Sequence, residues 1–183
     1  MQQYVIYSTN KFRCMNKRIY FAGGCFWGTE HYFKQIRGVI STQAGYANGT
    51  VPNPTYEEVY TDRTGYAETV MVEYNPEVVS LTLLCELFFR SIDPTSLNRQ
   101  GNDIGTRYRT GVYYTSDEDY DTICKVYTDI ERIIGETLVV EVEPLKNFYA
   151  AEEYHQDYLD KNPMGYCHIP RALMLMAREA NRE

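Results

Sequence analysis

The sequence has no long apolar run, and this absence argues against a membrane-spanning helix. No stretch approaches the roughly 18 consecutive apolar residues that such a helix needs. The first residues, Met1-Gln2-Gln3-Tyr4, lack a basic region followed by an apolar one, so we expect no secretory signal. The five cysteines show neither a C-x-x-C pair nor regular spacing, which favours a reducing compartment over a disulfide scaffold. We therefore expect a cytoplasmic protein.

Positive charge is also scarce. The chain carries 18 Lys and Arg against 25 Asp and Glu, a net charge of -7. No basic stripe is available to neutralise phosphate, so we expect no nucleic-acid partner, and without an apolar span we expect no membrane partner. No spacing of His, Cys and carboxylates matches a zinc site. The sequence therefore implies neither a metal nor an organic cofactor.

The chain also lacks internal repeats, low-complexity tracts and Pro/Gly/Ser linkers. With 183 residues, 44% of them hydrophobic, it is long enough for one domain with a substantial core. We predict a single domain over residues 18–183, preceded by a polar extension over residues 1–17. Cys14 lies in this extension, and nothing in the sequence connects it to a site.

Short strand-like segments alternate with helical ones along the chain. Residues 68–74 alternate so that Glu68, Val70 and Val72 share one face, as in a half-buried strand. Ser116 is expected to cap a long helix. We predict strands at 19–22, 39–46, 68–74, 112–114 and 138–142, helices at 26–36, 78–91, 116–134 and 152–160, and an amphipathic C-terminal piece. This order predicts an α/β fold, an α+β sandwich with a ferredoxin-like split β-α-β core, additional strands, long loops and an irregular C-terminal tail.

The most informative segment is Gly24-Cys25-Phe26-Trp27-Gly28, which follows the first predicted strand. A cysteine at the start of a helix faces unpaired backbone N–H groups and the positive end of the helix dipole, which favour the thiolate. Because the thiolate is the nucleophilic form, we predict that Cys25 is a nucleophile. The adjoining aromatic side chains could wall an apolar pocket beside its sulfur.

Further motifs follow in order: Ala44-Gly45-Tyr46, Gly65-Tyr66-Ala67-Glu68, the segment QGNDIGTRYR at 100–109, and Tyr154-His155-Gln156-Asp157-Tyr158. Together with the cysteine pentapeptide, they resemble the A class of methionine sulfoxide reductases, the peptide-methionine (S)-S-oxide reductases. The matching stretch runs from about residue 18 to about residue 170. The resemblance implies an enzyme that reduces the S epimer of methionine sulfoxide, free or in proteins, and so repairs oxidised proteins.

The resemblance also implies roles for individual residues. Cys25 would attack the sulfoxide sulfur, and Glu68 would protonate the departing oxygen. Glu68 shares a strand face with Val70, so we expect it to be partly buried, which would raise its pKa and keep it protonated. The family match assigns to Tyr46 and Tyr108 the hydroxyls that hold the sulfoxide oxygen. With 18 tyrosines in the chain, only the flanking motifs single out these two.

Three further residues are implied to bind substrate. Phe26 and Trp27 would form the pocket for the S-methyl group, since a sulfur-bound methyl packs favourably on aromatic faces. Asp103 resembles a family residue that orders or binds substrate, although an Asx-type turn in its Gly/Asn-rich loop explains it equally well.

The C-terminal tail resembles the family's recycling-cysteine segment. Attack would leave Cys25 as a sulfenic acid, which would condense with Cys167 to a disulfide that thioredoxin reduces. Pro163 and Gly165 suit a mobile loop able to carry Cys167 to Cys25. Some relatives carry two recycling cysteines here, whereas this chain has one, so we expect no relay within the tail. We expect the protein to act as a monomer.

Other interpretations of an activated thiol stay open on the residues alone. A thiol peroxidase or a cysteine hydrolase could use the same group, and His31 or His155 could approach Cys25, although neither sits in a protease-like signature. A redox sensor could instead use a disulfide to change partner binding. We expect the remaining thiols, Cys85 and Cys124, to lie in the core.

Overall fold

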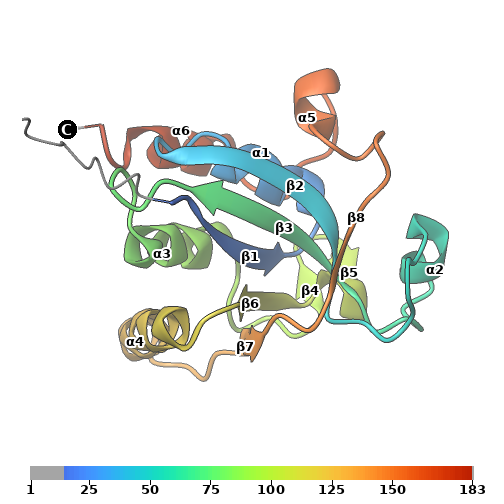
Figure 1. The fold of residues 1–183 in the computed structure, drawn as a ribbon, viewed down its shortest axis with the longest axis horizontal. Coiled ribbons are helices and arrows are strands. Elements are labelled where there is room, and N and C mark those ends of the chain that lie inside the picture. Colours follow the sequence, from blue (N-terminus) through green and yellow to red (C-terminus); the bar gives the residue numbers. More distant parts are fainter. Residues whose placement is uncertain (1–14, 183) are drawn as a thin grey trace, which may run out of the picture.

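A six-stranded sheet forms the centre of the protein (Figure 1). This computed structural model describes residues 15–182, so Cys14 and most of the predicted extension lie outside the described residues. The strands are β1 (Lys17–Gly23), β2 (Val39–Ala47), β3 (Ala67–Tyr74), β6 (Thr110–Tyr114), β7 (Glu141–Pro144) and β8 (Phe148–Ala150). A separate two-stranded ladder joins β4 (Arg99–Gln100) and β5 (Asp103–Ile104).

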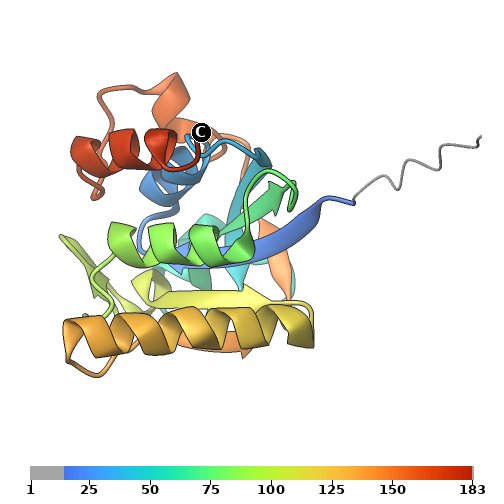
Figure 2. The same cartoon turned by 90° about the vertical axis from the view of Figure 1, so that its left-hand side faces the viewer.

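The helices are α1 (Phe26–Phe33), α2 (Tyr56–Tyr60), α3 (Leu81–Ser91), α4 (Asp117–Ile134), α5 (Tyr158–Lys161) and α6 (Arg171–Glu179), with a 3-10 turn at Thr106–Tyr108. Of these, α1, α3 and α4 pack on one face of the sheet (Figure 2). α1 packs on β2 and β3, α3 on β1, and α4 on β6, while α6 lies against α1 and α3. The side chain of Ser116 accepts from the backbone N–H of Asp119, which confirms the predicted cap of α4.

The sheet order is β7-β6-β1-β3-β2-β8. Two units, β1-α1-β2 and β3-α3-β6, interleave in this order. Strands β1 and β2 of the first unit lie on either side of β3, and strands β3 and β6 of the second unit lie on either side of β1. All of these neighbouring strands are antiparallel. This arrangement confirms the predicted ferredoxin-like split β-α-β core. The additional strands sit at the edges, with β7 parallel to β6 and β8 antiparallel to β2.

Several predicted boundaries are wrong. The predicted strand at 138–142 is found at Glu141–Pro144. The predicted helix at 152–160 is mostly turns, because Asp157 adopts a left-handed conformation (φ 53°) and helix α5 begins only after it. α2 and β8 were not predicted.

Cys85 is buried as expected, but Cys124 is only partly buried. Among the described residues, no helix is both long and apolar enough to cross a bilayer.

The turn from β1 into α1 positions the predicted nucleophile. Phe21 on β1 stacks on Phe33 of α1, with ring centroids 4.4 Å apart, and this contact fixes the helix on the sheet. Between them, Gly24 has φ 83°, and a Cβ there would lie 2.7 Å from the Cβ of Gln100. The glycine is required because both its conformation and the approach of the 93–106 loop leave no room for a side chain.

Candidate active site

Cys25 is the N-cap residue of α1 and is only 6% exposed. The backbone N–H groups of Trp27 and Gly28 at the start of α1 favour the thiolate and act to lower the pKa of Cys25, although its side chain makes no capping hydrogen bond. Burial, aided by the charge of Glu68, outweighs them and raises the pKa of Cys25 well above its ordinary value. The cost of desolvating the charge at this buried position exceeds the stabilisation that the helix start gives to the thiolate.

Glu68 lies on β3 at the same end of α1. Its side chain is 1% exposed, and its Oε2 accepts a hydrogen bond of 3.0 Å from the backbone N–H of Phe26. Burial raises the pKa of Glu68 to about 8, against the opposing effects of that hydrogen bond and of Arg107. Glu68 is thus a protonated acid at neutral pH, and in that form it places no negative charge beside Cys25.

The two aromatic residues after Cys25 form a wall with His155. The ring of Phe26 is buried, with its centroid 5.0 Å from His155 and 5.9 Å from Tyr46. Trp27 stacks on Tyr158 at 3.7 Å and donates from Nε1 to Nδ1 of His155 at 3.0 Å. Both side chains are thereby held in fixed orientations beside the start of α1.

The two predicted oxygen-binding tyrosines have different surroundings. Tyr108 ends the 3-10 turn, largely buried, with the guanidinium of Arg107 4.4 Å from its ring centroid. Tyr46 donates its hydroxyl to Oε2 of Glu152 at 2.8 Å. Burial raises the pKa of both phenols, and the Glu152 contact raises that of Tyr46 further. Both phenols are therefore neutral, and the hydroxyl of Tyr46 is already bonded to a carboxylate.

The tail that contains Cys167 packs against the first turns of α1. A Cβ placed on Gly28 would lie 3.1 Å from Sγ of Cys167, so this sulfur touches the helix one turn after Cys25. The thiol of Cys167 donates to the carbonyl of Ile169 at 3.4 Å. Asp103 accepts from the hydroxyl of Tyr166 at 3.1 Å, and its contacts are therefore with the tail.

Comparisons with known proteins agree with this geometry. A family model described as peptide methionine sulfoxide reductase matches residues 17–182. The chain belongs to the peptide methionine sulfoxide reductase family. The MsrA of Clostridium acetobutylicum is 53% identical over 158 residues, covering 86% of this chain and 98% of that protein. Mxr1 of Saccharomyces cerevisiae in reduced form is 42% identical with a TM-score of 0.80, covering 85% and 90% of the two chains.

A second similar structure is a complex of Mxr1 with a partner protein. Mxr1 in complex with Trx2 is 30% identical to this chain with a TM-score of 0.57, covering 80% of this chain and 86% of that one. The activity of the present protein is thiol-dependent reduction of peptide methionine sulfoxide, as its membership of the family establishes.

Sequence reasoning assigned no role to Glu152 and Tyr56 beside the reductase's aromatic wall, and it named His155 only as a residue that could approach Cys25. Glu152 accepts from the backbone N–H of Tyr56 at 2.8 Å as well as from Tyr46, and the Tyr56 ring lies 4.5 Å from His155. Burial lowers the pKa of His155, and its Nδ1 accepts from Trp27, so the ring is neutral with its proton on Nε2. The motif at 154–158 pointed to this segment, but the contacts across about a hundred residues of chain could not be foreseen.

Cys167 also lines a groove between α1 and α6. The groove has a volume of about 380 Å³ and includes Leu175, which is 50% exposed, and the cationic side chains of Arg171 and Arg178. Cys25 does not line it. Of the two sulfurs assigned to the reductase cycle, only that of Cys167 is therefore reached from this side.

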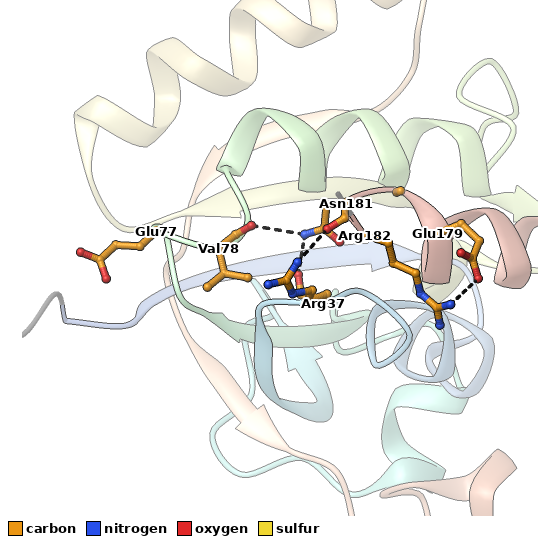
Figure 3. Close-up of a pocket in the computed structure, with 7 residues that line it drawn as sticks. Arg37, Glu77, Val78, Glu179, Asn181 and Arg182 are labelled. Carbon is orange, nitrogen blue, oxygen red and sulfur yellow. Dashed lines mark hydrogen bonds and ion pairs between the residues drawn. The ribbon is translucent and has the colours of Figure 1, made fainter.

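A different cavity, of about 500 Å³, lies at the end of α6 (Figure 3). There the side-chain amide of Asn181 donates to the carbonyls of Arg37 and Val78, and Arg182 pairs with Glu179. None of the residues predicted for the active site lines this cavity. Within residues 15–182, no group of three or more His, Cys, Asp and Glu is arranged to hold a metal ion.

Proposed function

We propose that Cys25 is the nucleophile of this reductase, that Glu68 is its proton donor, and that the substrate is the S epimer of methionine sulfoxide, free or in oxidised proteins. The observation that carries this proposal is the hydrogen bond of 3.0 Å from Phe26 to Glu68, which keeps the acid beside the start of α1. Cys25 attacks the sulfoxide sulfur as a thiolate, while the proton of Glu68 goes to the oxygen. The S–O bond of the substrate breaks and the protonated oxygen passes to Sγ of Cys25. The substrate sulfur is thereby reduced by two electrons and leaves as methionine, and Cys25 is oxidised by two electrons to a sulfenic acid.

The neighbouring side chains then orient the substrate. Phe26 and Trp27 offer their aromatic faces to the S-methyl group, a contact worth about 0.3–1.5 kcal/mol. Tyr108 and Tyr46 donate to the sulfoxide oxygen as negative charge develops on it. For Tyr46 this requires an exchange of its hydrogen bond from Glu152 to substrate. Asp103 completes the substrate-binding residues of this proposal with its carboxylate.

Cys167 resets the enzyme in this proposal. Its thiol attacks the sulfenic acid, water leaves, and a Cys25–Cys167 disulfide forms. Thioredoxin is the proposed reductant, supported by the complex of the related Mxr1 with Trx2. Because Cys25 is buried and Cys167 lines the groove beside α6, the incoming thiolate attacks the sulfur of Cys167 and releases Cys25.

Single-turnover reduction tests these assignments. The reduced protein is mixed with an excess of either epimer, without reductant, and the methionine formed and the thiols lost are counted. We expect turnover of the S epimer alone, with both Cys25 and Cys167 consumed. Cys167→Ser should still release one equivalent of methionine but lose thioredoxin-driven turnover, whereas Cys124→Ser, the matched control, should retain both. Turnover of only the R epimer, or full thioredoxin-driven turnover by Cys167→Ser, would overturn the assignments.

We further propose that the protein acts as a monomer in the cytoplasm. The four cysteines within the described residues are free thiols, which suits a reducing compartment. Sedimentation of the reduced protein at micromolar concentration checks the monomer, and fractionation of cells checks the compartment. A stable dimer, or recovery of the protein outside the cytoplasm, would contradict this proposal.

A further inference from the structure

We propose that His168 is a positioning residue for the recycling step, which holds residues 166–168 against α1 so that Cys167 stays within reach of Cys25. This inference rests on the proposed role of Cys167 and deepens it. The reduction of substrate does not use His168. The side chain acts instead on the second reaction, in which the sulfenic acid must meet a thiol.

His168 is bonded to the turn that leads into the nucleophile. Its Nε2 lies 2.9 Å from the carbonyl oxygen of Gly23, and because a carbonyl only accepts, this nitrogen carries the proton and donates. Its side chain is only 4% exposed, which is unusual for an imidazole in an otherwise exposed tail. A buried side chain bonded to the backbone two residues before Cys25 fixes the position of Cys167, its direct neighbour in sequence.

Asp103 holds the same segment from a second side. Its Oδ2 accepts from the hydroxyl of Tyr166 at 3.1 Å and lies 4.0 Å from Nδ1 of His168, which has no hydrogen-bond partner among the described residues. The residues before and after Cys167 therefore both face one carboxylate oxygen. We call Asp103, Tyr166 and His168 the tail clamp.

Glycines in the cysteine pentapeptide make room for the clamp. A Cβ on Gly28 would lie 3.2 Å from the imidazole of His168 and 3.1 Å from Sγ of Cys167, and a Cβ on Gly24 would lie 3.4 Å from Nε2 of His168. The tail thus approaches the backbone of α1 as closely as the absence of side chains permits. This approach places the sulfur of Cys167 against Gly28, which follows Cys25 by one helical turn.

The clamp matters because a sulfenic acid is reactive and can be oxidised further if no thiol reacts with it promptly. A docked Cys167 attacks at a high effective concentration. An undocked tail attacks more slowly, because closing its loop costs conformational entropy. Holding the tail in place therefore speeds disulfide formation without changing the first chemical step.

The test separates these two steps in single-turnover experiments with the S epimer. Methionine formation reports the first step, and quenched thiol counting reports the disappearance of Cys167. His168→Phe retains an aromatic ring but removes the donor to Gly23, and we expect disulfide formation to slow about tenfold, the factor that an ordinary buried hydrogen bond gives. Methionine formation should keep its rate, and a sulfenic-acid probe should label the accumulated intermediate.

Conservative variants distinguish positioning from mere folding. His168→Gln can restore a donor near the place of Nε2, and it should recover most of the lost rate. Tyr166→Phe removes the other bond of the clamp and should slow the same step. Tyr120→Phe is the matched control, since Tyr120 on α4 has the same 41% exposure as Tyr166 and should change neither step.

Either of two results would overturn the clamp: disulfide formation at the wild-type rate in both His168→Phe and Tyr166→Phe, or an equal slowing of methionine formation and disulfide formation. Failure of the proposed function gives a different result, since the unaltered protein would then form no methionine or would retain its Cys167 thiol.

Discussion

The backbone N–H of Phe26 donates to Oε2 of Glu68 at 3.0 Å, and this bond joins the buried acid of β3 to the helix that begins at Cys25. The pKa of Glu68 is raised to about 8, and that of Cys25 is raised well above its usual value. The proposed first step needs a thiolate and a neutral carboxyl, that is, one proton between the two groups. Because both pKa values are raised, the proposed mechanism requires the site to lose one proton before that step.

The first prediction concerns this proton. Methionine formation in a single turnover should rise about tenfold per pH unit from pH 6 toward pH 8, because both groups are protonated below the pKa of Glu68. Glu68→Gln should lower this rate by roughly 10²-fold to 10⁴-fold, the usual contribution of a positioned acid. It should also move the alkylation of Cys25 by iodoacetamide to lower pH, since the carboxylate charge that raises the Cys25 pKa is gone. A rate independent of pH between 6 and 8 would contradict the assignment.

The second prediction concerns stability. Glu68 has an ordinary pKa of 4.5 when unfolded and about 8 when folded, so the native state binds the extra proton between these values. The stabilisation that this extra proton gives to the folded state is fully present below pH 4.5. It is lost as the pH rises to 8, so the free energy of unfolding falls by about 1.4 kcal/mol per pH unit. Glu68→Gln removes this dependence. Urea unfolding should therefore show the variant gaining stability relative to the unaltered protein from pH 5 to pH 8, and a constant difference would refute the buried acid.

The third prediction compares the two tyrosines. Tyr108→Phe should lower the rate of methionine formation by roughly 10²-fold, the cost of removing one donor to developing charge. Tyr46→Phe should cost less, because the Tyr46 hydroxyl must first leave Glu152. In a double-mutant cycle, Tyr46→Phe and Glu152→Gln should be non-additive, since the two groups share one hydrogen bond. Equal losses in both tyrosine variants, with additive effects in the cycle, would show that the Glu152 contact is irrelevant to catalysis.

The fourth prediction concerns access to Cys167. Leu175→Glu introduces a charge into the apolar part of the groove, and it should raise the KM for thioredoxin about tenfold. Turnover with dithiothreitol should be unchanged, because a small dithiol needs no protein contact. Ile133→Glu, at a 77% exposed site on α4, is the matched control. Unimpaired thioredoxin turnover in Leu175→Glu would place the reductant on another face.

Much of the framework follows from local patterns. The alternation over 68–74 predicts the strand and the buried face of Glu68, and β3 has that face buried. The Ser116 cap predicts the start of α4 to the residue. Such features depend on side-chain periodicity and on hydrogen bonds within one turn of chain, so neighbouring residues determine them.

Contacts between distant segments required the tertiary structure. Sequence reasoning placed Tyr46 in the site but could not find its partner Glu152, which lies 106 residues away. It also treated the 162–168 segment as a mobile loop, whereas the structure docks it through His168 and Tyr166. Left-handed Asp157, which delays α5, is a further case, because single polar residues adopt this conformation wherever packing requires it.

The pentapeptide at residues 24–28 shows the same division. By itself, the sequence determined that a cysteine stands at the start of a helix between glycines, with two aromatic residues beside it, because strand and helix periodicity fix that junction. Only the tertiary structure decided the protonation state of Cys25, since desolvation and the position of Glu68 depend on how the sheet covers the helix end. It also decided why the glycines are there, because Gly24 and Gly28 leave the space that the 93–106 loop and the Cys167 tail occupy.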